Sequence, residues 1–469
     1  MSSPNRRLGP RRATRPIQDP AEARRWTETL TSDPFVRTTE EFLRRFPPAS
    51  AIQESMTSPV EEEPMTPRLP LGAAQHYDPI PAPPARPAPA LPRPSYSGLS
   101  DADDRDQHVI SKQTRINSGS KRTKNLVGLH NPGAWCYANS SIQAMFGSTG
   151  FAEELLSGEW TRTYQVPKKI DEKIMPPQLL TKIVANLFHW MQNGKFKAMQ
   201  AKTLMDYIAH ISSKDARGYP EIHDETNVRR DQPELIKQPD LNGRSVLEGA
   251  VEYWNQYIKS NASLITKYWR GLDATITSCK SCQYKTTRYE AFDLVPLAIQ
   301  RRSTLEASLQ AYTHTEDMAD YKCDKCQKHG TSIREQRFAR LPDLLCLQIR
   351  RFGSGDIKDH TEVEFPLRDV DMSPYFLRDN PGGVADHHFQ GPFIYDAYAV
   401  VLHAGGLRSG HYWSYVRDEY ASDPTQWHLF NDERVTPYNI RTPDDMRKLY
   451  KDGAGTAYIV FYQRRDVSR

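Results

Sequence analysis

The chain of 469 residues lacks a dominant charge and long apolar runs. Its 62 basic and 58 acidic residues leave a net charge of +4, so no single-sign field predicts binding to nucleic acid or to an anionic membrane. The longest apolar runs, such as residues 341–349, are too short to span a bilayer, and the N-terminus shows no secretory signal pattern. We therefore expect neither a membrane nor a nucleic acid among its partners.

Cysteine is also scarce, since six residues in this length are too few for a disulfide scaffold. Four of the six form two Cys-x-x-Cys pairs, which in a reducing compartment supply the four thiolates of a closed structural zinc site. The expected Zn²⁺ ligands are Cys279, Cys282, Cys323 and Cys326. His329 is an alternative ligand, and two unrelated redox pairs are the alternative to a metal. This interpretation places the protein in the cytoplasm or the nucleus.

Proline, in contrast, is concentrated at one end of the chain. Nineteen of the 35 prolines precede residue 95, and residues 79–94 favour an extended polyproline conformation. Such a composition cannot bury enough apolar surface to fold alone, which predicts a disordered tail over residues 1–122. A protein that binds this Pro-rich tail is a further hypothesis.

The remainder of the chain changes its pattern once. Residues 136–260 are helix-rich, with apolar residues at three- and four-residue offsets in 176–192 and 246–259. Between these two segments, residues 212–243 are polar and irregular, which indicates a long surface loop. Strand patterns dominate from about residue 272 to the end. A helical half followed by a strand-rich half predicts an α+β fold.

One cysteine stands in a context that suggests chemistry. Cys136 follows a Gly-containing turn and opens a predicted helix that ends near Gly147, where the helix dipole favours a thiolate. A small buried core cysteine is the alternative. A nucleophilic cysteine needs a base and a group that orients the base. His411 follows a glycine-rich turn at the start of a predicted strand, and His403 is its rival as the base.

The orienting group is expected at the end of another predicted strand. Asn431 and Asp432 are adjacent there, and either side chain offers an oxygen that accepts a hydrogen bond from an imidazole. Spacing alone does not choose between them.

These segments together resemble the ubiquitin-specific proteases. Residues 128–140, "GLHNPGAWCYANS", are similar to the cysteine box of that family, residues 395–418 to its histidine box, and "FND" at 430–432 to its third catalytic element. The resemblance covers about residues 124–465 in consistent order. It implies a catalytic domain over 123–469 with a papain-like cysteine protease fold: a helical thumb, a β palm, and β zinc-ribbon fingers at about 272–340.

The resemblance also implies a role for each site residue. Cys136 corresponds to the nucleophile, His411 to the general base and Asn431 to the residue that orients it. Asn131 corresponds to the oxyanion donor, and Asp432 lies beside Asn431 in the site. The implied activity is a thiol-dependent deubiquitinase, which hydrolyses the isopeptide or peptide bond after the C-terminal glycine of ubiquitin. Its implied partners are ubiquitin and ubiquitinated proteins.

The sequence departs from the family pattern at two places. Trp135 stands where the family usually has Thr or Ser, and residues 247–254, "LEGAVEYW", keep little of the box that holds the ubiquitin tail. Two alternatives therefore stay open. One is a catalytically weak or inactive scaffold of the same fold that binds ubiquitin or partners, and the other is a protease for a ubiquitin-like modifier.

Overall fold

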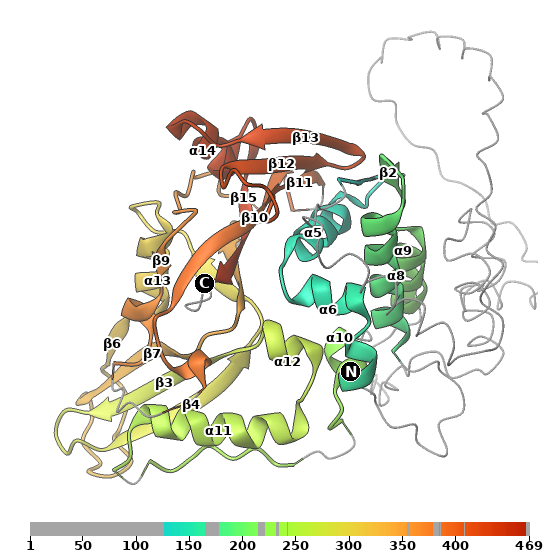
Figure 1. Cartoon of the computed structure of the whole chain (residues 1–469). Helices are drawn as coiled ribbons and strands as arrows, with labels where there is room; N and C mark the ends of the chain where they lie inside the picture. The colour runs from blue at the N-terminus through green and yellow to red at the C-terminus, as the bar shows by residue number, and fades with distance from the viewer. Residues whose placement is uncertain are drawn as a thin grey trace, which may run out of the picture.

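The computed structural model describes residues 126–465 except 165–177, 214–220, 231–233, 242, 354–356, 379–383, 385 and 408. The tail predicted over 1–122 therefore lies outside the described residues. Helices occupy the first part of the described chain and strands the second, in agreement with the predicted α+β class (Figure 1). Within the described ranges, the helices are too short or too polar to cross a bilayer.

The helical part has its helices close to the predicted positions. The helices are α5 (Cys136–Gly147), α6 (Phe151–Ser157), α7 (Trp160–Thr163), α8 (Leu179–Asn193), α9 (Lys202–Ser213), α10 (Ile222–Thr226), α11 (Val246–Ser260) and α12 (Leu264–Tyr268). The local sequence explains why α11 begins where it does. Ser245 accepts a hydrogen bond from the Glu248 N–H, and the Glu248 carboxylate accepts one from the Ser245 N–H, which is a capping box.

Helix α10 lies inside the segment predicted to be an irregular loop. Its Glu225 is buried, and the carboxylate accepts hydrogen bonds from the backbone N–H groups of Leu180 and Thr181 at the start of α8. A carboxylate at a helix N-terminus satisfies donors that the helix itself leaves unpaired. A contact with a distant part of the chain therefore holds this five-residue helix, and periodicity cannot reveal it.

A nine-stranded sheet forms the centre of the strand-rich part. Its strands are β5 (Val295–Ala298), β8 (Leu344–Arg350), β9 (Val370–Asp371), β10 (Ile394–Gly405), β11 (Gly410–Arg417), β12 (Gln426–Asn431), β13 (Arg434–Asn439), β14 (Lys451–Asp452) and β15 (Gly455–Arg464). The main order is β13-β12-β11-β10-β15-β8-β5, with β14 paired to β15 and β9 to β10. Only β5 and β8 among the described pairs of this sheet run parallel.

Both faces of this sheet are covered, as β10 shows. Tyr398 and Val401 pack into a core shared with α5, α6 and α8, whereas Val400 and Leu402 pack into a second core on the other face. Helices α13 (Leu305–Tyr312) and α14 (Pro443–Tyr450) contribute to the second core. Because successive side chains of a strand point to opposite faces, a strand between two cores has a nearly continuous apolar sequence.

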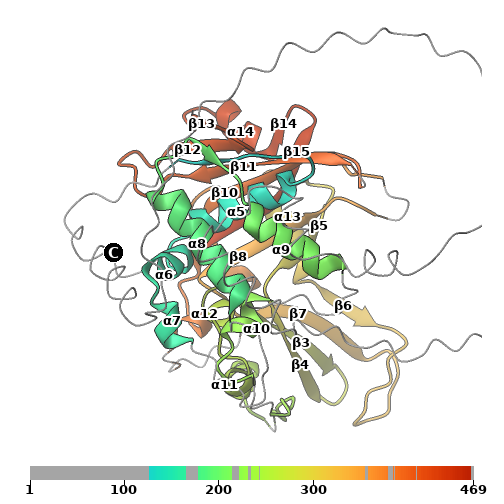
Figure 2. The same ribbon diagram turned by 90° about the vertical axis from the view of Figure 1, so that its right-hand side faces the viewer.

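A smaller antiparallel sheet projects away from the large one (Figures 1 and 2). Its strands are β3 (Gly271–Cys279), β4 (Lys285–Phe292), β6 (Thr315–Met318) and β7 (Ser332–Arg340), in the order β4-β3-β7-β6. Helix α11 packs along it, and the Tyr289 hydroxyl donates to the Val246 carbonyl at 2.6 Å. This sheet corresponds in position to the predicted fingers, and it carries both cysteine pairs near one end.

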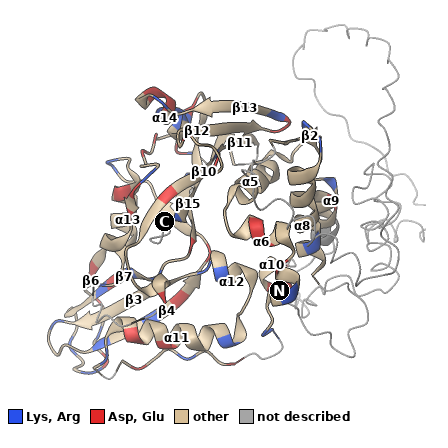
Figure 3. Ribbon diagram, in the orientation of Figure 1, with Lys and Arg blue, Asp and Glu red and all other residues tan. Residues whose placement is uncertain are grey.

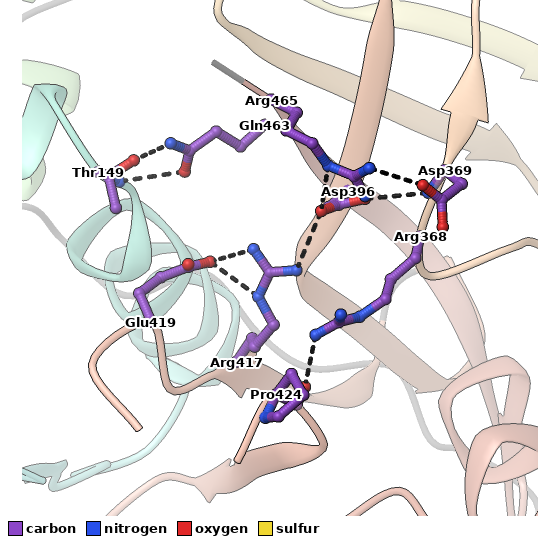
Figure 4. Close-up of polar contacts among 9 residues, drawn as sticks. All are labelled: Thr149, Arg368, Asp369, Asp396, Arg417, Glu419, Pro424, Gln463 and Arg465. Atoms are coloured by element: carbon purple, nitrogen blue, oxygen red, sulfur yellow. Dashed lines mark hydrogen bonds and ion pairs between the residues drawn. The ribbon is translucent and has the colours of Figure 1, made fainter. Parts of the chain in front are cut away.

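A polar network joins the helical part to the large sheet (Figure 4). Gln463 on β15 exchanges hydrogen bonds with Thr149, which lies between α5 and α6. Beside it, Arg465 pairs with Asp369 and Asp396, both at 2.6 Å. The Arg417 guanidinium lies between Glu419 and the same Asp396. The contact with Thr149 ties the C-terminal end of α5 to β15, and the ion pairs tie β15 to β10 and β11.

Charges of both signs are interspersed over the described elements (Figure 3). Neither sheet carries a long stripe of Lys and Arg alone, in keeping with the small net charge of the sequence.

A short parallel pair, β1 (Gly128–Leu129) with β2 (Ala198–Met199), generates the first prediction. A Cβ atom on Gly128 would lie 2.2 Å from the Glu433 carbonyl oxygen, which belongs to backbone that cannot rotate away. We expect Gly128→Ala to lower the free energy of unfolding by about 1–3 kcal/mol. A Cβ atom on Gly133 would meet nothing within 4 Å, so Gly133→Ala is the matched control. Urea unfolding of both variants measures the difference, and equal stabilities would refute this role of Gly128.

Candidate active site

The Cys136 thiol lies at the first residue of α5, as the sequence predicts. Helix α5 packs against β10 and β11, and the Cys136 side chain is almost fully buried. Its Sγ lies 3.9 Å from the carbonyl oxygen of Gly410, the residue that precedes His411. The N-terminus of a helix carries unpaired N–H groups and a partial positive charge, so donors surround this position.

The hairpin between β10 and β11 delivers His411. Gly405 pairs with Gly410 across this hairpin, and Gly405 has a φ of +106°. A Cβ atom on Gly410 would lie 2.3 Å from the His403 ring and 2.4 Å from the Ala404 carbonyl oxygen. The tight turn therefore requires both glycines. This turn places the Gly410 carbonyl, next to His411, 3.9 Å from Cys136 Sγ. Gly406 has open space around it, so the turn does not require that glycine.

Asn431 is the side chain that contacts the His411 imidazole. It is the last residue of β12, and its Oδ1 lies 2.7 Å from His411 Nε2. An amide oxygen only accepts hydrogen bonds, so Nε2 carries the proton and Nδ1 has the free lone pair. The imidazole is thereby held in the tautomer in which Nδ1 acts as a base.

Asp432 contacts a different set of residues. Its backbone has a left-handed φ of +51°, which directs the side chain away from His411 and toward the loop before α5. One carboxylate oxygen accepts a hydrogen bond from Asn131 Nδ2 at 3.0 Å, and the other accepts one from Asn139 Nδ2 at 2.9 Å. The Asp432 carbonyl also accepts from the Leu129 N–H. Asp432 thus connects the β12–β13 turn to β1, to the loop and to α5.

The orientation of the Asn131 amide follows from its partners. Its Oδ1 accepts hydrogen bonds from the backbone N–H groups of Gly133 and Trp135, at 3.0 and 2.9 Å. Its Nδ2 must therefore face the Asp432 carboxylate, and the hydrogen bond to Asp432 uses one of the two N–H donors of Nδ2. Within the described part of the chain, the second N–H has no hydrogen-bond acceptor.

His403, the rival candidate for the base, occupies a structural position. Its side chain is buried and stacks on the Tyr412 ring at 4.3 Å, and its backbone carbonyl accepts a hydrogen bond from the Lys358 amine. Burial, reinforced by the positive charge of Lys358, lowers the pKa of His403 to about 4. It is a neutral core side chain on the strand before His411.

The four cysteines predicted to bind zinc converge at one end of the smaller sheet. Cys279 and Cys326 have their sulfur atoms 3.7 Å apart, and Cys282 and Cys323 have the same separation. A tetrahedron of Zn–S bonds of about 2.3 Å has edges of about 3.8 Å, so the sulfur positions fit this metal. A hydrogen bond from the Thr331 hydroxyl lowers the pKa of the Cys279 thiol, whereas burial and the neighbouring thiols raise the pKa of Cys282 to about 11.

The structure therefore gathers Cys136, His411, Asn431, Asn131 and Asp432 in one place and the four zinc-type cysteines in another. Sequence analysis missed the part played by Asn139, whose Nδ2 contacts both Asp432 and the Leu129 carbonyl. Its position three residues after Cys136 in "CYANS", one helical turn away, was the signal that it belongs to the site.

Comparison with known proteins was made for both sequence and structure. Residues 127–462 match the family model described as ubiquitin carboxyl-terminal hydrolase. Ubiquitin carboxyl-terminal hydrolase 5 of Saccharomyces cerevisiae is 25% identical over 76% of this chain and 47% of its own length. Ubiquitin carboxyl-terminal hydrolase 2 of Bos taurus is 25% identical over 82% of this chain and 64% of its own length. The chain spans about half the length of the yeast relatives it matches.

Two solved structures have a similar fold. A yeast SAGA DUB module aligns with a TM-score of 0.53 and 19% identity, over 79% of this chain and 76% of its own. A SAGA DUB module bound to monoubiquitin aligns with a TM-score of 0.51 and 20% identity, over 79% and 77%. The extent of the family match, together with this fold, shows that the chain belongs to the ubiquitin carboxyl-terminal hydrolases of the ubiquitin-specific protease type.

Proposed function

We propose that this chain is a thiol-dependent deubiquitinase, which hydrolyses the isopeptide or peptide bond after the C-terminal glycine of ubiquitin. The observation that carries the proposal is the 2.7 Å hydrogen bond between His411 and Asn431. His411 belongs to β11, and this strand begins at Gly410, whose carbonyl oxygen lies 3.9 Å from the Cys136 sulfur. The names of the relatives and the monoubiquitin bound to one structural neighbour support ubiquitin and ubiquitinated proteins as its partners.

The proposed reaction begins with a proton transfer. His411 Nδ1 accepts the thiol proton of Cys136, and the thiolate attacks the carbonyl carbon of the terminal glycine. The imidazolium then gives its proton to the departing lysine amine, which leaves an acyl-enzyme. His411 next activates a water that hydrolyses the thioester and restores the thiol. Asn431 acts through His411 because it fixes the tautomer.

The negative charge of the tetrahedral intermediate needs donors that are already in position. The free N–H of Asn131 Nδ2 is one such donor, and the backbone N–H of Cys136 at the start of α5 is the other. Asp432 is a positioning residue in this scheme. Its carboxylate sets the direction of the Asn131 amide and, through Asn139, the position of the first turn of α5.

A protease for a ubiquitin-like modifier is the second candidate, and one observation favours it. In the segment that corresponds to the tail-binding box, Leu247, Ala250 and Trp254 of α11 are buried in the core. The half-buried Glu252 pairs with Arg244 at 2.6 Å. Of the positions that match the family's box, Ala250 and Tyr253 pack in the core and Glu252 forms this ion pair, so these positions alone do not select ubiquitin.

We also propose that the four-cysteine cluster holds a structural Zn²⁺ ion. All four ligand positions of such an ion would be filled by protein, which excludes a water that the metal activates. Its role would be to hold the ends of the β3–β4 and β6–β7 hairpins together. A thiolate cluster of this kind fits a reducing compartment, and we propose the cytoplasm or the nucleus.

The first activity prediction concerns the nucleophile. We expect Cys136→Ser to abolish both hydrolysis and covalent labelling by a ubiquitin probe with a C-terminal electrophile, because a hydroxyl is a far weaker nucleophile than a thiolate. Cys346→Ser is the control, since burial raises the pKa of that thiol to about 12 and Cys346 belongs neither to the active site nor to the four-cysteine cluster. Mass spectrometry of the labelled protein measures the result.

Two outcomes would change the proposal in different ways. Labelling of Cys136→Ser would remove Cys136 as the nucleophile. If the wild-type chain failed to react with the ubiquitin probe but reacted with the probe of a related modifier, that result would favour a protease for a ubiquitin-like modifier.

The second activity prediction separates the roles of Asn431 and Asp432. We expect Asn131→Ala and Asp432→Ala each to lower kcat by about 10²–10³-fold, the effect of losing one oxyanion donor. Asn431→Ala should lower kcat/KM by about 10²-fold, a general-base effect.

Double variants test the assignment directly. If Asp432 acts mainly through Asn131, the variant that combines Asn131→Ala with Asp432→Ala should be hardly slower than the slower single variant, because the two changes share the Asn131–Asp432 hydrogen bond. The combination of Asn431→Ala with Asp432→Ala should lose nearly the product of the single effects. The reverse pattern would place Asp432 with the imidazole.

The prediction for zinc separates stability from chemistry. We expect Cys323→Ser to remove one equivalent of zinc per chain and to lower the midpoint of thermal unfolding, because the metal would lose one of its four thiolate ligands. The kcat of the folded fraction should stay within a few-fold of the parent, since the cluster lies apart from Cys136. Elemental analysis with thermal unfolding measures both effects. Zinc content unchanged from that of Cys346→Ser would contradict the assignment.

A further inference from the structure

A second group of metal-ligand side chains lies outside both the active site and the four-cysteine cluster. Asp343 follows β7 in the connection to β8, whereas His387 and His388 belong to the short 3₁₀ helix η3 (His387–Phe389). The Leu341 N–H donates to the His388 carbonyl at 3.0 Å, which holds the two segments side by side. The fold thus brings together residues that lie 44 positions apart.

The three ligand atoms have the spacing that a small cation requires. His387 Nε2 and His388 Nε2 each lie 3.3 Å from Asp343 Oδ1, and all three atoms lie within 4.8 Å of one another. Zn²⁺ takes nitrogen and carboxylate ligands at about 2.0–2.2 Å, and a tetrahedron of such bonds has edges of about 3.3–3.5 Å. Both nitrogen–oxygen distances match that edge.

The tautomer of His388 gives a second, independent reason. Its Nδ1 lies 2.7 Å from Asp386 Oδ1, so Nδ1 carries the proton in the neutral ring and Nε2 has the lone pair. Only 9% of the residue is exposed, and Nε2 is buried without a hydrogen-bond partner among the described residues. A buried lone pair that faces a carboxylate oxygen is repelled by it, and a cation between the two atoms would turn repulsion into coordination.

Two arginines lie near the carboxylates of Asp343 and Asp386, but each arginine contacts other groups. The Arg340 guanidinium lies over the Trp254 ring at 3.9 Å. Arg464 donates to the carbonyls of Gln390 and Pro392, both at 3.0 Å. Within the described part of the chain, neither arginine forms an ion pair with Asp343 or Asp386. The charge of Arg340 acts on both carboxylates from a distance, and within the described residues their ion-pair contacts are with the two imidazoles.

We propose that Asp343 Oδ1, His387 Nε2 and His388 Nε2 form a binding site for a divalent cation of the Zn²⁺ type. Asp386 completes it, because a carboxylate on the far nitrogen of a histidine ligand fixes the ring and makes the ligand more basic. The His387 side chain is 62% exposed, so water reaches the fourth position. Imidazole and carboxylate ligands with one open position suit Zn²⁺ better than Mg²⁺ or Ca²⁺, which prefer oxygen ligands alone.

The site would act as a clip between two segments. It would join the β7–β8 connection to the stretch that leads into β10, the strand that carries the turn before His411. Because the ligands come from distant parts of the chain, binding stabilises the folded state over the unfolded one.

The experiment measures zinc bound per chain on the full-length protein after equilibrium dialysis against buffered Zn²⁺. We expect two equivalents for the wild-type chain and one for His387→Ala. Because the His387 side chain is exposed, we expect the His387→Ala variant to fold. His314→Ala is the matched control, since His314 is also exposed and faces a carboxylate, Glu316, at 3.1 Å. It should keep two equivalents, and Cys323→Ser should lose the other one.

Affinity and stability give a second measurement that structural damage would not imitate. Asp386→Asn should weaken zinc binding at this site by about 10–100-fold, the usual effect of changing a residue that orders a metal ligand. Added Zn²⁺ should raise the thermal midpoint of the wild-type chain more than that of His387→Ala. The proposal would be overturned if the wild-type chain bound one equivalent of zinc and lost it only when the cysteines were changed. Asp343 would then form an ion pair with protonated histidines. Equal binding by His387→Ala and His314→Ala would overturn it as well.

Discussion

The Asp432 carboxylate is the contact on which the geometry of the active site depends. Its two oxygens accept hydrogen bonds from two amides that come from different places, Asn131 in the loop and Asn139 in α5. A carboxylate accepts only, and both amides present their N–H groups to it, so the three side chains can take one arrangement. Because hydrogen bonds to a charged group are stronger than neutral ones, this arrangement resists displacement.

The turn that contains Asp432 serves two parts of the site at once. Asn431 still belongs to β12 and reaches the His411 ring, whereas the left-handed backbone of Asp432 turns the next side chain to the opposite partner. The dipeptide Asn431–Asp432 thus positions both the His411 imidazole and the Asn131 amide, the proposed donor to the oxyanion. The other end of α5 is fixed by different contacts, because Thr149 bonds to Gln463 and Gly147 lies against Val416. A helix held at both ends cannot slide along the sheet, so the Cys136 sulfur keeps its place.

The sequence predicts the parts of this structure that repeat or that stand in a motif. Apolar periodicity predicted α5, α8 and α11, strand patterns predicted that strands dominate from about residue 272, and the motif around Cys136 indicated which side chains meet. Features made by single contacts between distant residues could not be predicted. Glu225 holds α10 through the N-terminus of α8, and the partner of Asp432 depends on one φ angle. The group of Asp343 with His387 and His388 has no spacing signature, because it exists only where two loops touch.

The two cysteine pairs and the histidine group also differ in what surrounds them. Near the cysteine pairs, strand β6 alternates exposed and half-buried residues, and β4 has one buried residue, Tyr289. Little apolar surface is buried there, so a metal would supply stability that a core supplies elsewhere. The histidine group, in contrast, adjoins the buried rings of Phe389, Phe393 and Tyr395. The fold around it already has a core, so an ion there would adjust the position of the stretch before β10 on a structure that forms without it.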